Sequence, residues 1–253
     1  MAETTTQNYS LAKEKIKFLL LEGIHPRAAE LLKQSGYTQV DLRSGTQSRA
    51  ELADIIGEVH FLGIRSRTQL DAELLSKAHK LTAVGCFCIG TNQVDLTTAQ
   101  SLGVPVFNAP YANTRSVAEL ALAEAIMLMR GIPAKSMAAH RGEWKKSANN
   151  SSEVRGKTLG IVGYGHIGTQ LSILAEGLGM NVLYYDILSK LPLGNARPSP
   201  NLEHLLANSD VVSLHVPATQ QTHEMIGPEQ LSQMRAGSFL INASRGTVVQ
   251  IPA

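Results

Sequence analysis

Three glycines with the spacing G-x-G-x-x-G lie between an apolar run and a helical pattern. They are Gly163, Gly165 and Gly168, and the apolar run 159–162 before them is typical of a short strand. In such a strand-turn-helix unit, the first glycine permits a tight turn, the second leaves room for a pyrophosphate, and the third lets the helix pack closely. The free N–H groups at the start of a helix beginning near His166 favour a phosphate. A turn that binds no ligand can have the same spacing, so the residues around the motif must distinguish it from a dinucleotide site.

The residues after the glycine motif favour a dinucleotide site. Helical spacing is kept by Ile167, Leu171, Leu174, Ala175 and Leu178, and Gly179 ends the pattern. A second strand at 182–185 then leads into Asp186, 23 residues after Gly163. A carboxylate at this place in a dinucleotide fold accepts hydrogen bonds from the adenosine ribose hydroxyls. Because it would repel a 2′-phosphate and no arginine follows it closely, the sequence predicts NAD rather than NADP.

Three arginines follow predicted strands, where ligands bind in open α/β sheets. Arg65 and Arg67 follow the strand 59–64, and Arg245 follows the strand 238–242. Guanidinium groups bind carboxylates and phosphates through paired hydrogen bonds, so these residues favour an anionic substrate. The alternative is that strand-end arginines are solvated or pair with nearby acids.

Hydride transfer to a ketone also requires an acid that protonates the alkoxide, most often a histidine. Of the eight histidines, only His166 and His215 lie near the expected cofactor. His166 opens the phosphate-binding helix and is expected beside the pyrophosphate. His215 ends the strand 211–215 beside the cofactor and has no evident carboxylate partner. We therefore predict that both bind the cofactor, and neither is predicted to be the proton donor.

The elements that must position these residues alternate between strand and helix along the chain. Strands are expected at 17–22, 37–41, 59–64, 81–85, 104–107, 159–162, 182–185, 211–215 and 238–242. Helical patterns cover 26–34, 48–56, 71–79, 94–101, 166–178, 201–207 and 228–234. This alternation implies parallel sheets covered by helices. We expect an α/β protein of two tandem lobes, with a flavodoxin-like substrate lobe first and a Rossmann NAD-binding lobe second.

The helical segment 113–130 differs because it is apolar nearly all the way round. A helix without a polar face must be buried, here between two domains or two subunits. The residues 131–133 are expected to break it, and a polar stretch follows up to Gly156. The predicted organisation is a flexible tail at 1–15, a substrate-binding lobe at 16–110, and an NAD-binding domain at 111–253 that begins with this interface helix.

Composition narrows the possible classes of protein. Of 253 residues, 43% are hydrophobic and 17% are charged, as in a globular protein with a sizeable core. A net charge of +2 and 5% aromatic residues argue against nucleic acid as a partner. No run approaches the roughly 20 apolar residues of a membrane span, and residues 1–17 contain no apolar signal region, so we expect a cytoplasmic protein. Cys86 and Cys88 cannot complete a zinc set, so we expect buried thiols and no metal site.

Seven blocks resemble the D-2-hydroxyacid dehydrogenase family, from about Lys17 to Ala253. They are G-I-R-S-R-T at 63–68, G-C-F-C-I-G-T-N-Q-V-D-L at 85–96, N-A-P-Y-A-N-T-R-S-V-A-E-L at 108–120, L-G-I-V-G-Y-G-H-I-G-T-Q at 159–170, L-P-L-G-N-A at 191–196, S-D-V-V-S-L-H-V-P at 209–217 and N-A-S-R-G-T-V-V at 242–249. Several of these blocks occur across the family. The blocks at 85–93 and 191–196 are narrower and resemble its D-3-phosphoglycerate dehydrogenase branch.

The resemblance implies NAD-dependent oxidation of D-3-phosphoglycerate to 3-phosphohydroxypyruvate, the first step of serine biosynthesis. We expect the complete protein to be a homo-oligomer. It implies that Arg245 is the catalytic arginine, which polarises the substrate carbonyl and holds the carboxylate. The residues implied to contact NAD are His166, Ile167, Asp186, Ala243, Ser244 and Arg245. Those implied to contact the substrate are Arg65, Ser66 and Arg67, with backbone groups of 85–91.

The end of the chain departs from the family pattern. In the family, a catalytic glutamate and then a catalytic histidine follow the arginine block by some tens of residues, and this sequence ends at Ala253 before either. We therefore expect a fragment or truncated form with an incomplete Rossmann lobe. Two other interpretations stay open: a non-catalytic NAD-binding subunit or regulator, and a dehydrogenase of another 2-hydroxyacid such as 2-hydroxyglutarate.

Overall fold

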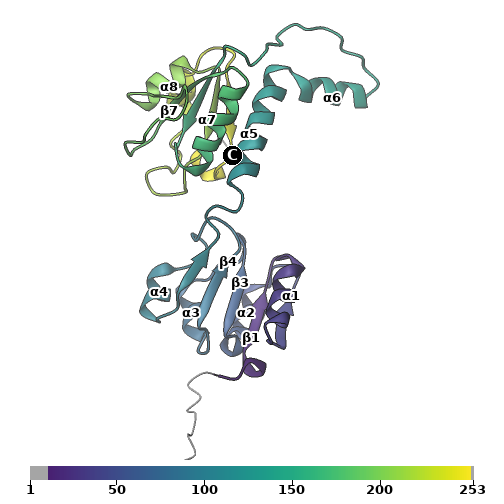
Figure 1. The fold of residues 1–253 in the computed structure, drawn as a ribbon, viewed down its shortest axis with the longest axis vertical. Coiled ribbons are helices and arrows are strands. Elements are labelled where there is room, and N and C mark those ends of the chain that lie inside the picture. Colours follow the sequence, from purple (N-terminus) through teal and green to yellow (C-terminus); the bar gives the residue numbers. More distant parts are fainter. Residues whose placement is uncertain (1–10, 252–253) are drawn as a thin grey trace, which may run out of the picture. The chain divides into compact units, whose positions relative to one another are not determined.

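The computed structural model describes residues 11–251, which form two compact units (Figure 1). The first unit ends at Ala112 and the second begins at Asn113. Each described unit contains one five-stranded sheet. Residues 1–10 of the predicted tail lie outside the described part, and Lys13–Lys15 form a short 3-10 turn. Lys13 Nζ ties this turn to the carbonyl oxygen of Ser35 at 2.8 Å.

The first sheet has the strand order β2-β1-β3-β4-β5, and every neighbouring pair is parallel. This order is that of the flavodoxin-like fold, so the predicted fold of the first lobe is confirmed. The elements are β1 (Lys17–Leu20), α1 (Pro26–Gln34), β2 (Gln39–Leu42), α2 (Arg49–Ile55), β3 (Phe61–Ile64), α3 (Ala72–Lys77), β4 (Ala83–Cys86), α4 (Leu96–Ser101) and β5 (Val106–Asn108).

All four α-helices in the described part of the first unit begin at residues whose side chains cap free N–H groups. At α1, His25 Nδ1 accepts a hydrogen bond from Arg27 N at 3.1 Å. Ser48 and Glu51 form a reciprocal capping box at α2, in which Glu51 Oε2 accepts from Ser48 N at 2.9 Å. Asp71 caps α3 and Asp95 caps α4, each by accepting a backbone N–H three residues later. These caps orient the helices so that apolar side chains such as Leu52 pack on the sheet.

The two faces of the first sheet are covered unequally. Helices α2, α3 and α4 contribute Leu52, Leu75 and Ala99 to the larger buried cluster. Helix α1 contributes Ala29 to a smaller cluster on the other face. An apolar groove continues along that face, and Phe107, one of the residues that line it, is 64% exposed.

The second sheet has the order β10-β9-β6-β7-β8, again with parallel pairs. When β6 is counted as strand 1 and the sheet is followed from β8 to β10, the order is 3-2-1-4-5, as in the Rossmann fold. The predicted class of the second lobe is therefore confirmed. The two-residue strand β8 was not predicted, because it is too short to show a pattern. The elements are β6 (Thr158–Val162), α7 (His166–Gly177), β7 (Asn181–Tyr185), β8 (Arg197–Pro198), α8 (Leu202–Asn208), β9 (Val211–Leu214), α9 (Pro228–Gln233) and β10 (Phe239–Asn242).

Helix α5 (Thr114–Met129) is buried on one side within the second unit. It packs against α7 and β10. Small residues make this close packing possible, and the buried side consists of Ala118, Ala121, Ala125 and Met129. Leu120, on the outer side, is 53% exposed. The apolar pattern therefore predicted the helix correctly. Within the second unit, however, only one side of the helix is buried.

The predicted break after α5 exists, but the chain then forms a second helix that the sequence analysis missed. Gly131 adopts the left-handed conformation with φ of 61°, which changes the chain direction. Helix α6 (Ile132–His140) follows, and Figure 1 shows it running off the end of α5. Pro133 is tolerated there because the first turn of a helix leaves its N–H groups unpaired anyway.

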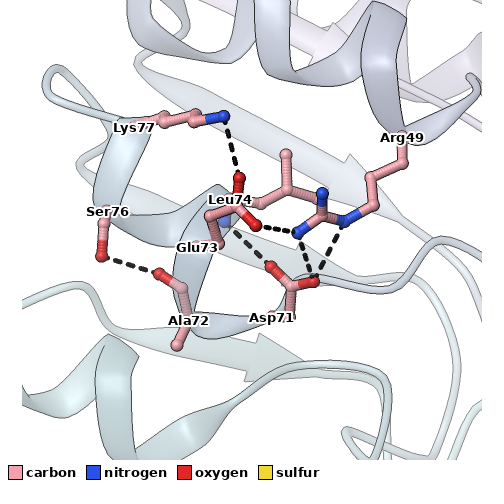
Figure 2. Close-up of polar contacts among 7 residues, drawn as sticks. All are labelled: Arg49, Asp71, Ala72, Glu73, Leu74, Ser76 and Lys77. Carbon is pink, nitrogen blue, oxygen red and sulfur yellow. Dashed lines mark hydrogen bonds and ion pairs between the residues drawn. The ribbon is translucent and has the colours of Figure 1, made fainter.

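Figure 2 shows a network of ion pairs between α2 and α3. Arg49 Nη2 lies 2.9 Å from Asp71 Oδ2 and 2.7 Å from Glu73 Oε2, and Lys77 Nζ lies 3.0 Å from Glu73 Oε1. All four side chains are about half exposed. The hydrogen bonds that Arg49 donates to Glu73 and Asp71 raise the pKa of its guanidinium. Arg49 thus joins the starts of two helices whose main packing is apolar.

Replacing Arg49 by methionine is expected to lower the thermal unfolding midpoint of the first unit at low ionic strength. At 1 M salt the Debye length shrinks to about 3 Å, so the difference from the unsubstituted protein should disappear. The matched control is Arg27→Met, which removes only the isolated pair with Glu30. A midpoint difference that persists undiminished at high salt would show that Arg49 acts through packing instead of charge.

Candidate functional site

The strands of the second sheet end on one line, which brings distant segments to the same edge. Val162 of β6 pairs with Tyr185 of β7 and with Leu214 of β9, and Leu214 pairs with Asn242 of β10. The residues that follow these ends are 163–168, Asp186, His215 and 243–245. The structure thus places all the predicted cofactor-binding residues at the carboxyl edge of this sheet.

The first and third glycines of the motif are required by close contacts. Gly163 has φ of 93°, and a Cβ atom there would lie 2.5 Å from the carbonyl oxygen of His215. A Cβ atom on Gly168 would overlap the carbonyl oxygen of Gly163. Gly165 differs, because nothing lies within 4 Å of the place its Cβ atom would occupy. The turn is therefore packed tightly on its inner side and open at its middle glycine.

The open glycine faces the start of helix α7, where a phosphate would fit. Gly165 is the N-cap residue, and no side chain there accepts a hydrogen bond from the helix. His166 is the first residue of α7 and Ile167 the second. Backbone N–H groups at an uncapped helix start, beside open space, are suited to the pyrophosphate of a dinucleotide.

Asp186 ties the end of β7 to the glycine turn. Its Oδ2 atom accepts a hydrogen bond from Tyr164 N at 2.9 Å, and its Oδ1 atom accepts one from Leu188 N at 2.9 Å. Each carboxylate oxygen can accept two hydrogen bonds, so acceptor sites remain for ribose hydroxyls. Tyr164 itself is 3% exposed and its ring stacks on Tyr184, with 3.9 Å between ring centroids. The tyrosine within the motif is therefore a packing residue.

His215 is partly buried behind the glycine turn. Its backbone N–H donates to the carbonyl oxygen of Val162 at 2.8 Å, and its Nε2 atom lies 2.9 Å from Ser213 Oγ. The Nδ1 atom is buried without a hydrogen-bond partner among the described residues. Burial lowers the pKa of His215 to about 4. The imidazole is therefore neutral near pH 7.

The segment 243–245 is shaped by Asn242, a residue that the sequence analysis did not single out. Asn242 Oδ1 accepts hydrogen bonds from Ser244 N at 3.1 Å and from Ser244 Oγ at 2.7 Å, while Nδ2 donates to the carbonyl oxygen of Arg245 at 2.9 Å. Arg245 Nη1 donates to the carbonyl oxygen of Ser244 at 3.0 Å. The only signal in the sequence was an asparagine at a strand end, where such turns are common.

The arginines of the first unit follow its central strand. Ile64 of β3 pairs with Cys86 of β4, and Arg65, Ser66 and Arg67 come next and are exposed. Within residues 11–251, the Arg65 guanidinium has no hydrogen bond or ion pair, and Arg67 Nε lies 3.8 Å from Glu22 Oε2. Two positive side chains at one strand end suit a ligand with phosphate or carboxylate groups.

Neither a metal cluster nor a membrane helix is found in the part of the chain that the structure describes. No three His, Cys, Asp or Glu side chains between residues 11 and 251 come together as metal ligands. No helix there combines the length and apolar character needed to cross a bilayer. Cys86 is buried and Cys88 partly so, and both are free thiols. Burial, with smaller effects of Cys88 and Glu22, raises the pKa of Cys86 to about 11.

Comparison with known protein families decides the class of the second unit. Residues 122–253 match the model of the D-isomer specific 2-hydroxyacid dehydrogenase, NAD binding domain. The chain belongs to this dehydrogenase family. The glycine turn and Asp186 therefore lie in an NAD-binding domain. The prediction of NAD as the cofactor is confirmed at this level.

The curated relatives extend the likeness to the first unit. The chain is 57% identical over 244 residues to the D-3-phosphoglycerate dehydrogenase of Escherichia coli (strain K12), covering 96% of this chain and 60% of the relative. It is 56% identical over 248 residues to that of Haemophilus influenzae and 51% identical over 238 residues to D-3-phosphoglycerate dehydrogenase 1 of Saccharomyces cerevisiae. The chain thus spans about 60% of the length of the bacterial relatives and 50% of the yeast relative.

Solved structures share the fold of the chain. The TT0316 protein from Thermus thermophilus has a TM-score of 0.85 and 30% identity, covering 93% of this chain and 76% of that one. A D-lactate dehydrogenase from Aquifex aeolicus, complexed with NAD and lactic acid, has a TM-score of 0.82 and 27% identity, covering 92% and 70%. Both likenesses agree with the two parallel sheets.

Two glycine substitutions should separate the packing role of the turn from its ligand role. Gly163→Ala should lower the free energy of unfolding by at least ~2 kcal/mol, because the new Cβ atom is strained and overlaps the backbone. Gly165→Ala should change that energy by less than about 0.5 kcal/mol but weaken NADH binding about tenfold, or about 1.4 kcal/mol. Denaturant unfolding and NADH fluorescence titration measure the two effects. Unchanged NADH affinity in Gly165→Ala would contradict a pyrophosphate beside this residue.

The partly buried His215, whose Nδ1 atom is shielded from solvent, predicts a pH-dependent stability. Its pKa in the folded state, about 4, is lower than the roughly 6.5 expected in the unfolded chain. The stability that this difference contributes is present above pH 6.5 and is lost as the pH falls toward 4. Between pH 7 and pH 5, the free energy of unfolding should drop by about 1–2 kcal/mol from this residue. Denaturant unfolding of His215→Gln should show that drop removed; an equal drop in the variant would rule out His215 as its source.

Proposed function

We propose that the protein catalyses the NAD-dependent oxidation of D-3-phosphoglycerate to 3-phosphohydroxypyruvate, the first step of L-serine biosynthesis. The observation that carries this proposal is the 57% identity to a D-3-phosphoglycerate dehydrogenase across 96% of the chain. That stretch includes the Arg65–Arg67 segment of the first unit as well as the NAD-binding domain. The exposed arginines at a strand end suit a substrate that carries a carboxylate and a phosphate.

Each predicted site residue has a place in this proposal. Arg245 is the catalytic arginine: its guanidinium holds the substrate carboxylate and polarises the oxygen at the carbon that is oxidised. Arg65, Ser66 and Arg67 bind the anionic groups of the substrate through paired and single hydrogen bonds. Bound NAD supplies the acceptor for the hydride. The oxidation also releases the hydroxyl proton, and His215 is too weak a base to accept it, because burial lowers its pKa to about 4.

The cofactor contacts follow from the geometry of the strand ends. We propose that the pyrophosphate lies against Gly165 and the start of α7, where His166 and Ile167 flank it. Gly163 and Gly168 set the turn that makes this approach possible. The carboxylate of Asp186 accepts hydrogen bonds from the adenosine ribose. The remaining contacts, along the neighbouring strand ends, come from His215, Ala243, Ser244 and Arg245.

The proposal includes self-association and a cytoplasmic location. Helix α6 and the residues after it expose apolar side chains: Ile132 by 43%, Met137 by 58% and Trp144 by 85%. Exposed apolar residues gathered on one segment are typical of an interface between proteins. We propose that they join two copies of the chain. Free thiols at Cys86 and Cys88 fit a reducing compartment such as the cytoplasm.

The proposed reaction is tested by measuring NAD reduction with the protein purified from its source, offered D-3-phosphoglycerate, D-2-hydroxyglutarate and D-lactate in parallel. We expect D-3-phosphoglycerate to have the highest kcat/KM, by about tenfold or more (about 1.4 kcal/mol per factor of ten). Its phosphate offers the arginines more charge and more acceptor oxygens than the second carboxylate of D-2-hydroxyglutarate, and D-lactate has no second anionic group. Arg245→Lys should lower this value at least tenfold, since lysine cannot form the paired hydrogen bonds.

Two results would contradict the proposal in different ways. A higher kcat/KM for D-2-hydroxyglutarate would assign the protein to another 2-hydroxyacid. Binding of NADH without turnover of any of the three substrates would instead indicate a non-catalytic NAD-binding subunit or regulator.

A further inference from the structure

Glu22 is a buried carboxylate whose hydrogen-bond donors all come from the Arg65–Thr68 segment. Its side chain is 1% exposed. Oε1 accepts hydrogen bonds from Arg65 N at 3.1 Å and Thr68 N at 2.9 Å, and Oε2 accepts one from Arg67 N at 3.0 Å. One side chain from the end of β1 thus binds three of the four backbone N–H groups in a segment far along the chain.

The backbone conformation at Glu22 is unfavourable for a residue other than glycine. Glu22 has φ of 62°, a left-handed conformation that glycine adopts freely and that costs other residues free energy. The turn is held by Glu22 N, which donates to the carbonyl oxygen of Gly45 at 3.0 Å. A glycine would fit this turn better than a glutamate does. The carboxylate therefore has to be explained by what it binds.

Gln93 binds the same segment through a backbone carbonyl oxygen of that segment. It is 2% exposed, and its Nε2 atom donates to the carbonyl oxygen of Arg65 at 2.8 Å and to that of Gly90 at 3.1 Å. The same atom lies 3.4 Å from Cys88 Sγ. Gln93 therefore joins the segment after β3 to the loop after β4. Glu22 binds the N–H groups of the arginine segment, and Gln93 binds a carbonyl oxygen of it.

We propose that Glu22 and Gln93 are positioning residues, which set the backbone of Arg65–Thr68 so that Arg65 and Arg67 bind an anionic substrate. This inference rests on the proposed function, in which those arginines contact the substrate. A loop that leaves a strand end has unpaired N–H and carbonyl groups, and buried partners fix its conformation. The Arg67 side chain meets Glu22 only through Nε, at 3.8 Å, and is 68% exposed. Its two terminal nitrogens stay available to a ligand.

The carboxylate of Glu22 stays charged in this place. Burial alone would raise its pKa, but the hydrogen bonds from Thr68, Arg67 and Arg65 together lower the pKa below the ordinary value. The charged and titratable groups around it are Arg65, Arg67 and the thiol of Cys86. A neutral amide of the same size would present an N–H₂ group to backbone donors and would lose some of the three hydrogen bonds that Glu22 accepts.

Glu22→Gln tests this directly in the full chain. We expect the backbone amides of Arg65, Arg67 and Thr68 to lose at least tenfold in hydrogen-exchange protection, and the Kd for D-3-phosphoglycerate to rise at least tenfold. The Kd for NADH, whose site lies in the second unit, should stay unchanged. Glu58→Gln is the matched control, because Glu58 is an exposed carboxylate of the same unit that pairs with Lys17 and Lys80. It should change none of these quantities.

Gln93→Met provides a second variant in case Glu22→Gln does not fold. Methionine keeps the length of the side chain but cannot donate to the carbonyl oxygens, so phosphoglycerate binding should again weaken selectively. Protection of the loop amides and phosphoglycerate affinity equal to those of Glu58→Gln would overturn the inference. An unsubstituted chain that binds NADH but no phosphoglycerate would instead overturn the proposed function and, with it, the role of Glu22 and Gln93 in substrate binding.

Discussion

The structure depends on the parallel register of its strands, which gathers the ends of each sheet at one edge. Hydrogen bonds between parallel strands fix which residues are neighbours, so segments that follow paired residues must emerge together. In the second unit, Val162, Tyr185, Leu214 and Asn242 lie on one such line. The glycine turn, Asp186, His215 and the segment 243–245 meet because of that line. No one of these segments could form the site alone.

A second constraint acts on the loops themselves. A loop at a strand end has backbone groups that no sheet neighbour binds, and those groups need other partners. In each case a polar side chain near a strand end supplies them: Asp186 binds the glycine turn, Asn242 binds the turn before Arg245, and Glu22 binds the arginine segment. Stability and site geometry therefore depend on the same few hydrogen bonds, and the apolar cores only fix the strands that carry them.

Prediction from the sequence succeeded best where a residue type suits only one structural role. Glycines at 163 and 168 and the acid at 186 indicate the Rossmann turn, and alternating apolar patterns indicate the two sheets. It missed features that only contacts reveal. Helix α6 was missed because Gly131 and Pro133 read as a stop, although a left-handed glycine also allows a new helix to begin. Strand β8 was missed because its two residues carry no periodicity.

The sequence alone therefore determined the class of fold, the order of its elements and the dinucleotide motif, since these depend on local spacing and on residues with restricted uses. Only the tertiary structure decided which side chains hold the loops. Glu22 and Gln93 lie 43 and 28 residues from Arg65 along the chain, and nothing in their neighbourhood in the sequence links them to it. Their role follows from burial and hydrogen bonding across strand ends, which arise only when the sheet forms.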